Sequence, residues 1–107
     1  SGQNNIGFGY YTLLGNSTGS DNIAMGRNAL QSSNSSSNIA LGSNALYSNS
    51  TAGRNTAIGE SALYSQSYSN SGTAWNSDNV AVGYEALYSN QPTSTSDGIS
   101  NIVFGFQ

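Results

Sequence analysis

The stretch from Asn38 to Tyr47 reads N-I-A-L-G-S-N-A-L-Y, and Asn55 to Tyr64 repeats it as N-T-A-I-G-E-S-A-L-Y. The shared pattern is N-x-A-φ-G, where φ is a large apolar residue, with A-L three residues after the Gly. Six copies of N-x-A-φ-G or a close variant begin at Asn5, Asn22, Asn38, Asn55, Asn79 and Asn101. The spacings between these asparagines are 17, 16, 17, 24 and 22 residues. Such self-similarity indicates stacked structural repeats.

Each repeat column predicts a place in the fold. Side chains alternate along a strand, so Ile39 and Leu41 share one face and Ala40 takes the other. We expect the two large apolar columns to point into a core: Phe8, Met25, Leu41, Ile58, Val82 and Phe104 at φ, and Leu13, Leu30, Leu46, Leu63 and Leu87 after it. The column between Asn and φ is small, which implies close packing against the second face: Gly7, Ala24, Ala40, Ala57, Ala81 and Val103.

The remaining columns predict corners and short strands. The Gly of each copy suits positive φ or close backbone approach, and the Asn suits local backbone bonding or a ladder along the stack. No stretch has helical length, and Gly, Asn, Ser and Thr are weak helix formers. The sequence therefore predicts an all-β parallel β-solenoid of six coils of 16–24 residues. Each coil would hold the strand N-x-A-φ-G, a corner, a second strand around A-L-Y and a polar turn.

Composition excludes several classes of function. Cys and His are absent, so there is no zinc finger, disulfide framework or haem ligand. Lys is also absent, and the only basic residues are Arg27 and Arg54. With a net charge of −3 the chain has no basic surface that would bind nucleic acid. No apolar run reaches the ~20 residues that span a bilayer. The few carboxylates are too far apart or out of phase for a glycosidase pair. We expect no enzyme activity, no cofactor and no metal.

The repeat resembles the head repeats of trimeric autotransporter adhesins of the YadA type. It is still more similar to repeats of bacteriophage and algal-virus tail fibres, and residues 38–56 and 55–64 carry the closest match. The resemblance implies a left-handed β-roll, three chains side by side, and an extracellular, cell-surface or virion location. The chain departs from the family in its longer unit and its two expanded spacings.

Association is also expected from the residues themselves. We expect residues 1–107 to form one β-roll domain, a fragment or module of a longer fibre. One thin roll buries a small core, and small domains without disulfides or metals need another support. Open first and last coils would pair with other chains unless capped. Two assemblies remain open: a homotrimer, and a filament that polymerises end to end.

Binding residues are expected on the long turns and on one edge of the stack. Insertions lengthen the turns at residues 65–78 and 89–100, and loops on a rigid scaffold commonly carry binding. Tyr68 and Trp75 in the first insertion are either a ligand platform or a plug that packs on the coil or on a neighbouring chain. Tyr47, Tyr64 and Tyr88 form a structural ladder, an interface with a neighbouring protomer, or an exposed binding stripe.

Three N-x-[ST] sequons fall in the polar turns, at Asn16, Asn34 and Asn49. They are either glycan acceptors or chance matches in a chain rich in Asn and Ser. The sequence thus predicts a structural fibre or adhesin module whose turn loops attach to a receptor or host-surface glycan. The alternative is a structural subunit of an extracellular filament.

Overall fold

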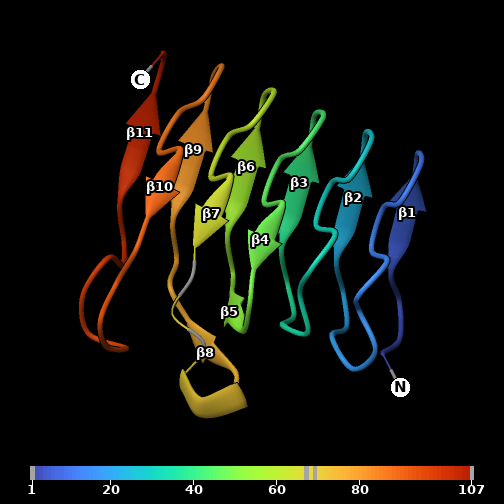
Figure 1. Cartoon of the computed structure of the whole chain (residues 1–107), viewed down its shortest axis with the longest axis horizontal. Coiled ribbons are helices and arrows are strands. Elements are labelled where there is room, and N and C mark those ends of the chain that lie inside the picture. The colour runs from blue at the N-terminus through green and yellow to red at the C-terminus, as the bar shows by residue number, and fades with distance from the viewer. Residues whose placement is uncertain (1, 67, 69, 107) are drawn as a thin grey trace.

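Parallel strands dominate the structure, a computed structural model that describes residues 2–66, 68 and 70–106. Its largest sheet has six parallel strands in the order β1-β2-β3-β6-β9-β11 (Figure 1). Their bounds are Ile6–Phe8 (β1), Ile23–Met25 (β2), Ile39–Leu41 (β3), Thr56–Ile58 (β6), Val80–Val82 (β9) and Ile102–Phe104 (β11). Each lies inside a predicted N-x-A-φ-G segment. The register places φ opposite φ, for example Leu41 opposite Ile58, which confirms the all-β prediction and the repeat register.

A second layer, the parallel sheet β10-β7-β4, lies beside the six-stranded sheet, and the pair β5-β8 lies below both in the view, beyond the ends of the six strands (Figure 1). The bounds are Ser48–Asn49 (β4), Ala52–Gly53 (β5), Ser65–Gln66 (β7), Trp75–Asn76 (β8) and Ser89–Asn90 (β10), with a 3-10 turn η1 at Asn70–Gly72.

The second strand of each unit was predicted around A-L-Y, and that placement is wrong. Ala45 and Leu46 lie in a turn, and β4 begins one residue after Tyr47. Leu46 has φ 50, a left-handed conformation that redirects the chain instead of extending it. The equivalent leucines of the other units have φ between 48 and 55. The A-L pair therefore forms the corner that leads into the second layer.

The Gly columns confirm the predicted corner after each strand of the large sheet. At Gly59, φ is 128, and a Cβ there would lie 2.5 Å from the carbonyl oxygen of Gly83 in the next repeat. Neither the backbone angle nor the space suits a side chain. The repeats can therefore stack closely at this corner only with Gly.

The φ column was expected in the core, but in the structure its side chains lie on the outward side of the six-stranded sheet. Ala57 is fully buried, whereas the adjacent Ile58 is 38% exposed. The Leu column is confirmed: Leu30, Leu46 and Leu63 are fully buried. These leucines fill the inner space, so the column opposite them must stay small. A Cβ at Gly7, for example, would lie 3.2 Å from Cδ1 of Leu13. The buried apolar cluster is therefore made of leucines and alanines.

The Asn column forms the predicted ladder along the stack. Nδ2 and the backbone N–H of Asn38 donate to Oδ1 of Asn22, at 3.2 and 2.9 Å. The same two groups of Asn55 donate to Oδ1 of Asn38, at 3.2 and 3.0 Å. We call this set the asparagine ladder: Asn5, Asn22, Asn38, Asn55, Asn79 and Asn101. It lies inside the molecule, on the same face of the sheet as the alanines.

A second set of buried amides faces the ladder from the other layer. Nε2 of Gln66 donates to Oδ1 of Asn49 at 3.1 Å, and Nδ2 of Asn90 donates to Oε1 of Gln66 at 2.7 Å. Nδ2 of Asn79 joins the two sets by donating to Oε1 of Gln66 at 2.8 Å. Among the described residues, every buried side-chain nitrogen and oxygen has a partner. The interior is thus half apolar and half a satisfied amide network, which avoids the cost of unpaired buried polar groups.

Candidate binding surfaces

The outward side of the six-stranded sheet is an apolar surface, which we call the outer face. It carries the φ column and the residues just before the alanines: Ile6, Ile23, Ile39, Thr56, Val80 and Ile102. All twelve side chains are half-buried or exposed, and eleven are apolar. Phe8 and Phe104 on the two edge strands are each 72% exposed. Contiguous apolar surface of this kind marks an interaction site.

The opposite wall carries a stack of tyrosine rings, the tyrosine ladder. Tyr47 and Tyr64 have ring centroids 5.0 Å apart with planes 8° apart, and Tyr64 and Tyr88 are 4.9 Å and 2° apart. Partial burial, and then the neighbouring phenols, raise the pKa of Tyr64 above its ordinary value. Because the rings cover one another, Tyr64 offers its edge and hydroxyl to solvent and not its faces. This geometry favours the structural interpretation of the column.

Trp75 and Tyr68 pack against each other in the first long turn. Trp75 belongs to β8, which pairs with β5, and its side chain is only 8% exposed. Its indole N–H donates to the carbonyl oxygen of Tyr68 at 3.3 Å, and the two rings meet edge to face at 5.7 Å. The arrangement favours the plug interpretation over an open platform for sugar rings.

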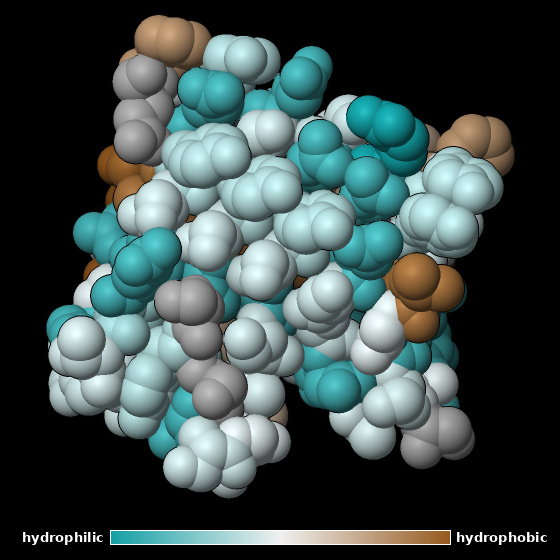
Figure 2. Space-filling model, in the orientation of Figure 1, coloured by the Kyte–Doolittle hydropathy of each residue, from teal (hydrophilic) through white to brown (hydrophobic). Residues whose placement is uncertain are grey.

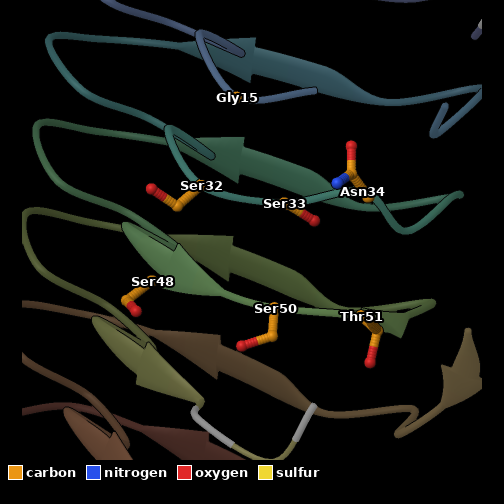
Figure 3. Close-up of a pocket in the computed structure, with 7 residues that line it drawn as sticks. All are labelled: Gly15, Ser32, Ser33, Asn34, Ser48, Ser50 and Thr51. Atoms are coloured by element: carbon orange, nitrogen blue, oxygen red, sulfur yellow. The ribbon is translucent and has the colours of Figure 1, made fainter. Parts of the chain in front are cut away.

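Beside the tyrosine ladder, residues of two neighbouring repeats line an open polar hollow of about 340 Å³ (Figure 3). The side chains around it belong to Ser32, Ser33, Asn34, Ser48, Ser50 and Thr51. Gly15 of the preceding repeat closes one end. In Figure 2 this wall of the molecule is largely pale or hydrophilic.

A line of serines crosses the same wall in register. Ser32 bridges to Ser48, Ser48 pairs with Ser65, and Ser65 pairs with Ser89. We call these four residues the serine row. Each is half-buried or exposed, whereas the next residue in β4, β7 and β10 is a buried amide. The row and the hollow meet at Ser32 and Ser48.

The three sequons lie in different environments. Asn49 is fully buried, and its Nδ2 donates to Ala52 O at 2.7 Å. Asn16 is half-buried, and its amide exchanges two bonds with the backbone of Gly19. Asn34 is exposed, and its Oδ1 accepts bonds from N and Oγ of Ser17 at 2.8 and 3.0 Å. Of the three sequon asparagines only Asn34 is exposed, and the fully buried Asn49 offers no access for a glycan.

The second long turn is organised by one carboxylate. Asp97 accepts bonds from the backbone N–H of Ser94 at 2.8 Å and of Thr93 at 3.1 Å, and from Oγ1 of Thr93 at 2.8 Å. These bonds hold the pKa of Asp97 at about 2, below its ordinary value of 3.8. The carboxylate thus acts as a turn-forming group.

The described residues hold no group of three or more His, Cys, Asp or Glu that could bind a metal ion. None of their helices is long and apolar enough to cross a membrane. Comparison with protein-family models, characterised proteins and solved structures gives no match. The two walls of the molecule are therefore the features that bear on its function.

Two features of the structure were not predicted from the sequence, one on the wall with the tyrosine ladder and one in the interior. The hollow combines residues of neighbouring repeats, and no single motif contains it. The buried amides Asn49, Gln66 and Asn90 do have a signal, because each follows A-L-Y-S directly. An amide fixed at that place in three repeats is the pattern that could have revealed the second buried set.

Proposed function

We propose that the chain is a structural module of an extracellular fibre or surface adhesin. Its stacked repeats would form a left-handed parallel β-roll of six coils, and identical chains would associate side by side through the outer face. The observation that carries this proposal is the size and uniformity of that face. Six strands at about 4.8 Å spacing give apolar rows about 24 Å long.

A second copy of the chain is the occupant that fits this face. The outer face contains no ionisable side chain, so charge complementarity offers nothing to a charged partner. Aliphatic and aromatic columns in register can interdigitate with the same columns of another copy. Burying them contributes roughly 25 cal/mol for each Å² of apolar surface. The resemblance to adhesin heads favours three chains, and the opposite wall with its long turns would remain available for attachment to a receptor or glycan.

Sedimentation velocity and light scattering test the assembly directly. We expect a folded species of fixed size, three times the 11.0 kDa chain. Ile58→Asp places a charge on the outer face and should shift the protein to smaller species, since an unpaired charge is costly to bury. Leu14→Asp is the matched control, because Leu14 is 63% exposed and lies outside the outer face.

Two outcomes would contradict the trimer. A folded, monodisperse wild-type chain of 11.0 kDa would exclude self-association. Growth without limit would instead support the alternative function, a filament subunit that stacks end to end through edge strands β1 and β11.

A further inference from the structure

The polar hollow lies on the wall that assembly through the outer face leaves uncovered. Its side chains come from two neighbouring repeats, with Ser32, Ser33 and Asn34 on one segment and Ser48, Ser50 and Thr51 on the next (Figure 3). A volume of about 340 Å³ falls within the range of small-ligand sites. The hollow is therefore large enough and accessible enough to hold part of a ligand.

The chemistry of the lining is uncharged and rich in hydroxyl groups. Ser32, Ser48 and Ser50 each offer a hydroxyl that can donate and accept. The side chain of Asn34 is held in one orientation, because its Oδ1 accepts bonds from Ser17. Its NH2 group can therefore serve as a donor to a ligand. Ser33 is bonded to the interior through Ser35 and Asn49. None of the described residues that line the hollow has a charged side chain. Such a lining fits a neutral ligand with many hydroxyls.

The serine row adds a direction and a period to this chemistry. Its four hydroxyls stand on strands about 4.8 Å apart along the stack. One sugar of an extended β-linked polysaccharide has nearly this length, so each sugar would lie over one strand of the row, and alternate sugars, which turn the same edge to the wall, would meet equivalent serine hydroxyls. The tyrosine ladder runs beside the row and adds phenol edges and hydroxyls.

We propose that this wall binds an extended, neutral β-linked glycan along the serine row, with one sugar in the hollow. The inference is based on the proposed role as an adhesive module and names the ligand class and its place. The ligand would contact the straight wall of the stack, whereas Trp75 and Tyr68 in the long turn stay packed on each other.

Calorimetric titration of the full chain with defined hexasaccharides tests the ligand class. Cellohexaose, xylohexaose and mannohexaose are extended and neutral, maltohexaose is neutral but curved, and hexagalacturonate is anionic. We expect binding of at least one extended neutral hexasaccharide, with at least tenfold weaker binding of the curved and anionic probes. Preference for hexagalacturonate, or no binding of the three extended probes, would overturn the proposal.

Two matched variants test the place of binding. Ser50→Val removes a hydroxyl and adds bulk inside the hollow, and should weaken binding at least about tenfold, because the facing sugar hydroxyl loses its partner. Ser43→Val makes the same change after the Gly42 corner, outside the hollow, and should leave affinity unchanged. Chemical-shift changes on titration should centre on Ser32, Asn34 and Ser48. Equal affinities of the two variants, or shifts centred elsewhere, would overturn the site.

Sedimentation velocity on the same samples separates the two proposals. An intact assembly that binds no neutral glycan would overturn the glycan site and leave the assembly standing. A folded monomer that binds through the hollow would support the site and overturn the assembly. If Ser50→Val fails to fold, Asn34→Ala on the exposed rim replaces it, with the same expected loss of affinity.

Discussion

The two faces of the six-stranded sheet reverse the usual relation between side-chain size and burial. The inner face carries asparagine and alanine, and Ala57 and Asn38 are fully buried there. The outer face carries Ile, Leu, Met, Val, Phe and one Thr, and all of these side chains are half-buried or exposed. The inner face is limited by the leucines of the opposite corner, which leave room for little more than a methyl group. The outer face has no such limit within one chain.

The largest effect is expected from a change on the buried side. Leu46→Ala opens space against the alanine column and should lower the free energy of unfolding by about 2–5 kcal/mol. Leu14→Ala is the control at an exposed leucine and should change it by less than about 0.5 kcal/mol. Urea unfolding followed by circular dichroism measures both. Similar losses for the two variants would mean that the Leu column is not the apolar core.

A smaller effect should follow from breaking the asparagine ladder. Asn38→Ala leaves the backbone N–H and Nδ2 of Asn55 without their shared acceptor and removes one of the two donors to Oδ1 of Asn22, at a cost of about 1–3 kcal/mol. Asn101→Ala removes only the bond that Nδ2 of Asn101 donates to Oδ1 of Asn79, so it should cost less. The thermal unfolding midpoints of the two variants measure this difference. A larger loss of stability for Asn101→Ala than for Asn38→Ala would mean that the central asparagines of the ladder do not contribute more than the terminal one.

Shortening an apolar side chain on the outer face should weaken assembly while changing the stability of the single chain little. Leu41→Ala should lower the unfolding free energy of the dissociated chain by less than about 1 kcal/mol, because Leu41 is only half-buried there. The same change should weaken association, seen as dissociation at higher protein concentration in sedimentation experiments. A loss of chain stability as large as that of Leu46→Ala would remove the distinction between the two faces.

The smallest effect concerns pH. Neither face of the sheet carries an ionisable group, and the response that we predict is that of the turn around Asp97. Its pKa is about 2 against an ordinary 3.8, so the stabilisation of this turn is present above pH 3.8 and is lost as the pH falls through about 2. NMR of the Asp97 side-chain carboxyl as a function of pH measures the midpoint of its titration. Thr93→Ala removes one donated bond and should raise it; an unchanged midpoint would contradict the role of that bond.

Sequence periodicity predicted the strands of the six-stranded sheet, their register and the glycine corners, because these depend on local backbone geometry and on which residues repeat; it misplaced the second strand of each unit, where A-L forms a corner. It did not predict which face is buried. Ala40 and Leu41 are both apolar, and choosing between them depends on how much space Leu46 of the opposite corner occupies. The space left between the sheet and that corner depends on both layers of the molecule together. The larger side chain was therefore assigned to the core, and the structure places the smaller one there.

The site was less predictable than the fold for a related reason. Trp75 and Tyr47 attract attention because aromatic residues are few and large, yet one is buried and the other has its ring stacked on Tyr64. The hollow is made of serines that are common throughout the chain. Only the register between repeats brings Ser32 and Ser48 side by side, and register across a turn is not visible in a single motif.

The asparagine ladder also has a mechanical consequence. Each rung donates toward the preceding repeat and accepts from the following one, so the amide bonds lie along the direction in which the repeats stack. Tension along that direction pulls these bonds lengthwise together with the backbone bonds of the same boundary. The bonds of one boundary share the load in parallel, while successive boundaries lie in series. Adding repeats therefore lengthens such a stack without increasing the force needed to break it, and the weakest boundary sets that force.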